Sequence, residues 1–178
     1  TGLVGAGRSE SVRIFCGADK GEYKTLLLDG KPLKIKSARD GIDNGILLVS
    51  EHRKLEGLVM GNSVRDNFGL PNFDHLSRKG FINLKKEDKE FSKFVKSLSI
   101  KIPTNEALAG NLSGGNQQKV VLAKWLYRDF DVIIFDEPTR GIDVGAKFEI
   151  YQIINELADA GKVIILISSE MPEILGLS

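Results

Sequence analysis

Residue types that bind phosphate and magnesium stand in separate stretches of this sequence. Residues 2–9 read GLVGAGRS, which has the spacing of a P-loop, G-x-x-x-x-G-K-[ST], with one change. Glycines in such a loop let backbone N–H groups turn toward a phosphate, and the following helix adds positive partial charge at its N-terminus. The hydroxyl of Ser9 is placed to ligate Mg²⁺. The residues of this stretch predicted to bind the nucleotide are Gly2, Gly5, Ala6, Gly7, Arg8, Ser9 and Glu10. A glycine-rich turn with a purely structural role is the alternative.

The change in this loop is Arg8, which stands where lysine is usual. Lysine is a compact point charge, whereas arginine is a wide planar fork, so the exchange is not conservative. Arg8 keeps the positive charge, and we therefore expect nucleotide binding to survive while catalysis suffers. Glu10 adds a negative charge beside the phosphate position.

A second stretch, residues 132–138, reads VIIFDEP, an apolar run that ends in two carboxylates. In phosphoryl-transfer ATPases an acidic residue at such a strand end holds the Mg²⁺ shell, and the P-loop hydroxyl faces it. Asp136 fits that role, and Glu137 fits a base or water-orienting role. The alternative is a strand end that merely meets solvent.

A third stretch, residues 112–119, reads LSGGNQQK. Two glycines before a helix expose its N-terminus together with the hydroxyl of Ser113, which suits an anion. Ordered glycines cost conformational entropy, so a plain helix start does not need them. An ordinary loop before a helix remains the alternative.

The elements that position these stretches follow from hydrophobic patterning. Short apolar runs at 46–49, 132–135 and 163–167 predict strands buried on both faces, and they alternate with helices predicted at 9–15, 117–127 and 147–160. This order predicts an α/β fold with a parallel sheet covered by helices. Residues 23–28 predict a further strand, closed by a turn at 29–30.

The segment from about 56 to 111 is more polar and richer in lysine, and its apolar spacing predicts a mostly helical subdomain. Its charge run, 85–96, is typical of a solvated helix face. A surface that docks a partner is the alternative.

Composition bounds the remaining possibilities. The 178 residues suit one globular domain, and 42% apolar with 7% aromatic residues is ordinary for an α/β protein. A net charge of +1 gives no indication of a nucleic-acid partner. The single cysteine, Cys16, excludes an intrachain disulfide, and no apolar run approaches the about 20 residues that span a bilayer. The abrupt beginning and the helix-like end predict a fragment of a longer chain.

The run LSGGNQQK, followed by FDEPTRGID at 135–143, resembles the signature, Walker B and D-loop of ATP-binding-cassette (ABC) ATPases, in family order after the P-loop. The resemblance implies a P-loop NTPase fold that uses ATP and Mg²⁺. It implies a RecA-like core at 1–55 and 112–178, a helical subdomain at about 56–111, and an N-terminal β-subdomain that is largely absent. The positions that it assigns to nucleotide binding are Ser113, Gly114, Gly115, Asn116 and Asp143.

Variations within these motifs resemble the C-terminal cassette of tandem ATPases that import ribose, galactose, xylose and similar sugars. GAGRSE at 5–10, SEHRK at 50–54, ISSEM at 167–171 and Asn116 all follow that group. By this resemblance Glu51 stands at the glutamine-loop position and Ser169 at the switch-histidine position. The implied catalytic set is Glu137, Glu51 and Ser169, and the implied Mg²⁺ ligands are Ser9, Asp136 and Glu51.

Arg8, Glu51 and Ser169 depart from the active pattern, so we expect weak hydrolysis or none at this chain's own P-loop. Loss of one charge-stabilising group costs on the order of 3 kcal/mol of transition-state stabilisation. The signature is intact and is expected to complete, in trans, the ATP site of a second cassette in the same full-length chain. The implied setting is the cytoplasmic face of a membrane, with transmembrane permease subunits as partners and a sugar-binding protein as an indirect one.

Two other functions stay open. A non-catalytic regulatory nucleotide-binding module would carry the same degraded motifs. A DNA-maintenance ABC ATPase would insert long coiled coils between P-loop and signature, and no sustained heptad run intervenes here.

Overall fold

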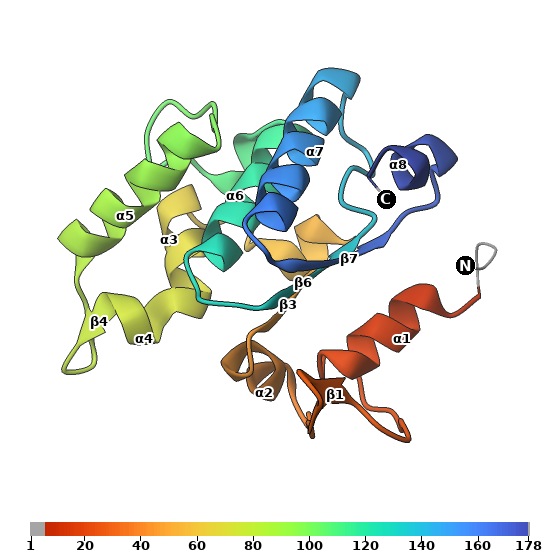
Figure 1. Cartoon of the computed structure of the whole chain (residues 1–178). Coiled ribbons are helices and arrows are strands. Elements are labelled where there is room, and N and C mark those ends of the chain that lie inside the picture. Colours follow the sequence, from red (N-terminus) through yellow and green to blue (C-terminus); the bar gives the residue numbers. More distant parts are fainter. Residues whose placement is uncertain (1–5, 178) are drawn as a thin grey trace. The chain divides into compact units, whose positions relative to one another are not determined.

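The chain forms two units that interleave along the sequence. Figure 1 shows its helices and strands, coloured from the N-terminus to the C-terminus. The computed structural model describes residues 6–177. The first unit comprises Thr1–Leu48, Phe130–Glu137 and Leu157–Ser178, and the second comprises Val49–Asp129 and Pro138–Glu156. The predicted subdomain boundaries near 56 and 111 divide the chain differently and stay a prediction. No helix within residues 6–177 combines the length and the apolarity needed to cross a bilayer.

The first unit contains a small parallel sheet and its flanking helices. Its elements are α1 Arg8–Phe15, β1 Leu27–Leu28, β2 Lys31–Pro32, α2 Ala38–Asp43, β3 Ile46–Val49, β6 Val132–Asp136, β7 Val163–Ile167 and α8 Met171–Leu177. β3 reaches one residue into the second unit. The predicted α/β architecture is confirmed, and the helix predicted at 9–15 begins one residue earlier, at Arg8.

The sheet has the strand order β3-β6-β7, and β6 and β7 run parallel from the pair Val132–Val163 to the pair Asp136–Ile167. Every residue of the central strand β6 is buried, as the apolar run predicts. β7 differs from the prediction of burial on both faces, since Val163 and Ile165 are 56% and 39% exposed. β7 is an edge strand, and periodicity alone does not distinguish a continuous apolar run at an edge from one at the centre.

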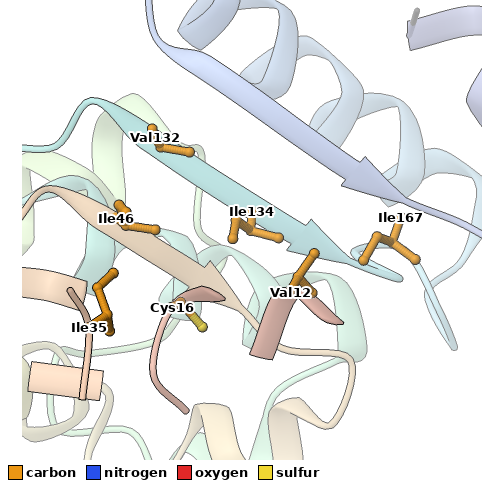
Figure 2. Packing of buried hydrophobic residues seen from close by; sticks show 7 residues of the cluster. All are labelled: Val12, Cys16, Ile35, Ile46, Val132, Ile134 and Ile167. Atoms are coloured by element: carbon orange, nitrogen blue, oxygen red, sulfur yellow. The ribbon is translucent and has the colours of Figure 1, made fainter. Parts of the chain in front are cut away.

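One face of this sheet is covered by α1 (Figure 2). Val12 and Cys16 of α1 pack with the side chains of all three strands in one apolar cluster. The full cluster is Val12, Cys16, Ile35, Ile46, Val132, Ile134 and Ile167. This packing holds α1 against the strands of the sheet.

Of the strand predicted at 23–28 only β1, Leu27–Leu28, is present, paired antiparallel with β2. One further backbone hydrogen bond follows Pro32, from the N–H of Leu33 to the carbonyl of Leu26 at 2.9 Å. Upstream, the hydroxyl of Tyr23 accepts a hydrogen bond from the backbone N–H of Ile35 at 2.9 Å and holds the segment without strand pairing. The turn predicted after the strand is present, with Asp29 and Gly30 both at positive φ.

The second unit is mostly helical, as predicted for much of its length. Its elements are η1 Arg53–Gly57 (a π-helical turn), α3 Val64–Gly69, η2 Leu70–Asn72, α4 Phe73–Leu76, β4 Ser77–Arg78, β5 Phe81–Ile82, α5 Leu84–Ser97, η3 Ala109–Asn111, α6 Gly114–Leu126 and α7 Val144–Asp159. The last residues of α7 belong to the first unit. Phe68 of α3 and Phe91 of α5 are fully buried, with ring centroids 5.3 Å apart.

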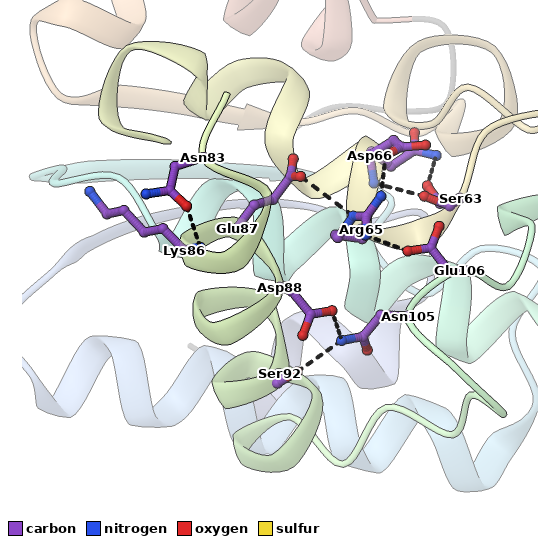
Figure 3. Close-up of polar contacts among 11 residues, drawn as sticks. Ser63, Arg65, Asp66, Asn83, Lys86, Glu87, Asp88, Ser92, Asn105 and Glu106 are labelled. Atoms are coloured by element: carbon purple, nitrogen blue, oxygen red, sulfur yellow. Dashed lines mark hydrogen bonds and ion pairs between the residues drawn. The ribbon is translucent and has the colours of Figure 1, made fainter. Parts of the chain in front are cut away.

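Polar contacts around Arg65 tie α3 to α5 (Figure 3). Nε of Arg65 lies 3.4 Å from Oε2 of Glu87, whose side chain is only 2% exposed, and Glu106 pairs with the same guanidinium. Burial raises the pKa of Glu87, and the positive charge of Arg65 acts in the opposite direction. The lysines of α5 are exposed, which agrees with the solvated face predicted for the charge run.

Candidate functional site

The described part of the phosphate loop leads directly into α1. Gly7 is the N-cap residue, with φ 74° and ψ 22°, a left-handed conformation that glycine adopts without steric cost. Arg8 and Ser9 form the start of the helix, and Glu10 in the first turn is exposed to solvent. Gly2 and Gly5 lie outside the described residues.

Ser9 and Asp136 meet where α1 begins and β6 ends. The hydroxyl of Ser9 donates a hydrogen bond to Oδ1 of Asp136 at 2.9 Å, and Asp136 is only 3% exposed. Hydroxyl and carboxylate oxygens are hard ligands of the kind that Mg²⁺ prefers. Two such oxygens converging on one point fit the metal position predicted from the sequence.

Glu137 follows in a strained backbone conformation. Its φ is 47°, in the left-handed region that residues with a Cβ rarely adopt, and its N–H donates to the carbonyl of Ile167 at 2.9 Å. Strain of this kind costs on the order of 1–3 kcal/mol and is concentrated at functional sites. It directs the Glu137 side chain toward Ser169, whose hydroxyl donates to Oε2 of Glu137 at 3.0 Å.

Arg8 reaches the same end of the sheet from α1. Its Nη1 donates to the backbone carbonyl of Ser168 at 3.2 Å, in the loop that follows β7. Arg8, Ser9, Asp136, Glu137 and Ser169 therefore gather at the carboxyl end of the strands, and we call them the sheet-edge cluster. Ligands of parallel α/β sheets bind at this end.

The second group of predicted residues lies at the N-terminus of α6. Ser113 is the N-cap residue, and its Oγ accepts hydrogen bonds from the backbone N–H of Asn116 at 3.4 Å and from Nδ2 of Asn116 at 3.0 Å. Oδ1 of Asn116 accepts from the backbone N–H of Lys101 at 2.7 Å. Asn116 therefore joins the signature serine to the segment that follows α5.

The two glycines of the signature are required by close packing. A Cβ on Gly114 would lie 2.7 Å from Nη2 of Arg53 and 2.9 Å from the carbonyl oxygen of Gly141. A Cβ on Gly115 would lie 2.5 Å from Cβ of Ala146 on α7. Contacts under 3 Å do not occur at real Cβ atoms, so glycine lets α6 begin directly against α7 and the loop before it.

A cavity of about 250 Å³ opens beside the start of α6. Asp143 contributes to its wall and caps α7, since its Oδ1 accepts from the N–H of Ala146 at 3.0 Å. Nζ of Lys119 lies 2.7 Å from Oε2 of Glu149, so these two charges compensate one another. The lining residues are Lys101, Ser113, Gly115, Asn116, Lys119, Asp143, Gly145, Ala146 and Glu149.

Glu51 belongs to the second unit, where its carboxylate pairs with the guanidinium of Arg140. Arg53 reinforces this link, because Nη1 donates to the carbonyl of Arg140 at 2.7 Å and Nη2 to that of Gly141 at 3.2 Å. The segment after β3 and the D-loop at 138–143 are thus held together by two arginines.

The structure accordingly brings the predicted residues together in groups. The sheet-edge cluster unites five of them, the cavity unites Ser113, Gly115, Asn116 and Asp143, and Gly114 adjoins Arg53 and Gly141. Sequence reasoning gave no role to Lys101, which no motif contains, or to Arg53, although Arg53 lies within the SEHRK stretch at 50–54. It also left Lys119 without a role, although this residue closes the LSGGNQQK run.

Comparisons with known proteins identify the family of this chain. The family model described as ABC transporter matches residues 1–140. The ribose import ATP-binding protein RbsA of Oceanobacillus iheyensis is 52% identical over 100% of this chain, and the xylose import ATP-binding protein XylG of Thermoanaerobacter pseudethanolicus is 53% identical over 99%. The chain spans only 36% and 35% of the length of these relatives.

A solved structure with the same fold is a dimeric ATP-binding cassette, MJ0796, in a post-hydrolysis state bound to ADP and Pi. It superposes with a TM-score of 0.76 at 21% identity, covering 96% of this chain and 73% of that chain. The family match extends over most of the chain and includes the phosphate loop, the signature and the strand-end carboxylates. This chain belongs to the ABC transporter family.

Proposed function

We propose that this chain is the nucleotide-binding part of an ATPase that drives monosaccharide import from the cytoplasmic face of a membrane. Relatives named for ribose, xylose and arabinose import are 52%, 53% and 52% identical to it. Their names support a sugar as the cargo, permease subunits as the membrane partners and a sugar-binding protein as an indirect partner. Nucleic acid is not among the proposed partners.

The observation that carries the nucleotide role is the hydrogen bond between Ser9 and Asp136 at the end of β6. In the proposed site these oxygens hold Mg²⁺, while Ala6, Gly7 and the N-terminus of α1 face the phosphates. Bound Mg²⁺ neutralises charge on the β- and γ-phosphates. Gly2, Gly5 and Glu10 complete the proposed loop, and Glu51 is the proposed third Mg²⁺ ligand.

The same cluster supports weak hydrolysis at this site. The guanidinium of Arg8 is engaged by the carbonyl of Ser168, whereas a lysine at this position would extend a single ammonium group. The hydroxyl of Ser169 donates to Oε2 of Glu137, so the carboxylate proposed to orient the attacking water is held by a protein group. Ser169 also lacks the imidazole ring, which in a histidine at this position can carry a positive charge. We therefore propose a site that binds ATP and turns it over slowly.

The cavity beside α6 supports a second role for the chain. It combines a helix N-terminus, the hydroxyl of Ser113 and close-packed glycines, which suit the phosphate of a nucleotide held by another P-loop. We propose that the chain is the C-terminal cassette of a tandem protein. Its signature residues, with Asp143 nearby, complete the ATP site of the other cassette in trans.

ATPase assays on the full tandem protein with its permease test this proposal. Ser113→Arg fills the cavity with a long cation and is expected to abolish most ATP hydrolysis. Glu137→Gln is expected to leave most of it, because the active P-loop belongs to the other cassette. Ser97→Arg, at the exposed end of α5, is the matched control for the added charge. Near-normal turnover in Ser113→Arg, or loss of turnover in Glu137→Gln, would contradict the proposal.

A further inference from the structure

The side chain of Asn116 is held at both ends of its amide by protein groups at the edge of the signature cavity. Its Oδ1 accepts from the N–H of Lys101, and its Nδ2 donates to Oγ of Ser113. The backbone N–H of Lys101 can only donate, so it fixes which end of the amide faces the serine. Asn116 therefore presents one N–H of its amide to Ser113, and each end of the amide makes a hydrogen bond within the protein.

This arrangement determines what Ser113 can do. A serine hydroxyl has one proton to donate and two lone pairs that accept. Both lone pairs of Ser113 are taken, one by the backbone N–H of Asn116 and one by its Nδ2. The proton of the hydroxyl is then left for a group in the cavity, and that group must be an acceptor.

We infer that Asn116 is a positioning residue that commits the hydroxyl of Ser113 to donate, which selects a phosphate oxygen as its partner. This inference rests on the proposed trans role of the signature. It differs from the sequence-based expectation that Asn116 itself contacts the nucleotide. Asn116 acts through Ser113, and its anchor is the backbone of Lys101.

The test is Asn116→Asp in the full tandem protein, which keeps the size of the side chain and replaces the donating amide by a carboxylate. The serine then donates its proton to that carboxylate and loses it for the phosphate. We expect kcat/KM for ATP to fall by about tenfold or more, the size typical of losing a hydrogen bond to a charged group. Asn116→Ala removes the amide without adding charge and is expected to give a smaller loss, because one lone pair of Ser113 becomes free.

A pH profile separates positioning from a structural role. The new carboxyl group in Asn116→Asp donates as the amide does only when it is protonated, so activity relative to a control should recover only as pH falls below about 5, toward the ordinary pKa of an aspartic acid of about 3.9. Asn111→Asp adds the same charge two residues before Ser113 at an exposed position and is that control. Lys101, Lys119, Asp143 and Glu149 line the cavity in every variant, so the ratio at each pH isolates the introduced group.

A double-mutant cycle with Ser113→Ala completes the experiment. If Asn116 acts through Ser113, kcat/KM for ATP in the variant that carries both changes is no lower than in Ser113→Ala alone, so the two losses are not additive. Additive losses, or a loss in Asn116→Asp that does not depend on pH, would overturn the inference. A large loss of activity in Ser113→Ala with no loss in Asn116→Asp would overturn the positioning role of Asn116 and leave the proposed trans role of the signature standing. Full activity in Ser113→Ala would overturn the proposed trans role, and this inference with it.

Discussion

Lys124 carries a charge into the interior of the second unit. It lies on α6, is 7% exposed, donates through Nζ to the carbonyl of Gly57, and places Nζ 5.2 Å from the centroid of the Trp125 ring. Burial lowers its pKa from 10.5 to about 8. A buried cation of this kind costs free energy that its neutral form does not.

The lowered pKa predicts how stability depends on pH. Between about 8 and 10.5 the unfolded chain binds a proton that the folded chain has released, so the free energy of unfolding rises with pH across this window. The gain is about 3 kcal/mol, present in full above the unfolded pKa and lost as pH falls through about 8. Urea denaturation of this chain and of Lys124→Met at several pH values checks it. The variant should lack this rise, and parallel curves for the two proteins would contradict the assignment.

At the scale of elements, the close contact between α6 and α7 depends on Gly115. A Cβ there would meet Cβ of Ala146 at 2.5 Å, so Gly115→Ala should destabilise the fold by about 1–3 kcal/mol through overpacking. In an Ala146→Gly background the same change should be neutral or stabilising, because alanine favours a helix over glycine by about 1 kcal/mol. Equilibrium unfolding of the four proteins gives the coupling energy. Gly145→Ala is the control, since a Cβ there lies at an ordinary 3.5 Å from Asp143. A coupling energy near zero would show that α6 and α7 separate without cost.

The elements that sequence predicted best are those whose own residues determine them. β6 was predicted because five apolar or strand-ending residues stand together, and α1 because glycines and a helical pattern adjoin. β7 was assigned correctly as a strand, but its exposed face depends on the absence of a further strand beside it among the described residues. Of the strand expected at 23–28 only Leu27–Leu28 is present, and upstream of it Tyr23 is held by the N–H of Ile35, a tertiary contact that no local pattern predicts.

The candidate site likewise contains residues that the local sequence predicts and contacts that depend on tertiary packing. Ser9, Asp136 and Ser113 were predicted because motif spacing reflects short-range geometry around a phosphate. The bonds of Arg53 to the D-loop carbonyls and of Asn116 to Lys101 join segments 87, 88 and 15 residues apart in sequence. Such contacts follow from tertiary packing, and no local pattern encodes them.

At the scale of the whole molecule, we propose that the two ATP sites of one tandem protein hydrolyse ATP at unequal rates. The site headed by this chain has Arg8 bonded to Ser168 and Ser169 bonded to Glu137, in place of a lysine and a histidine that would stabilise charge on the phosphate. Each missing stabilising group costs on the order of 3 kcal/mol, or about two orders of magnitude in rate. The asymmetry should therefore be reversible by changing a few residues.

The corresponding experiment inactivates the other cassette by replacing its P-loop lysine, so that only this chain's site can turn over. Phosphate release should then be close to background. Adding Arg8→Lys, Glu51→Gln and Ser169→His should raise it by about a hundredfold or more, since these changes restore charge stabilisation at the γ-phosphate. Adding Glu137→Gln to that variant should return release to background, which assigns the gain to this site. Calorimetric titration with ATP and Mg²⁺ should show binding before and after the changes, because Ser9 and Asp136 are kept. Robust release from the unmodified site, or no gain in the restored variant despite ATP binding, would mean that these three residues do not limit hydrolysis and that the unequal division of work is wrong.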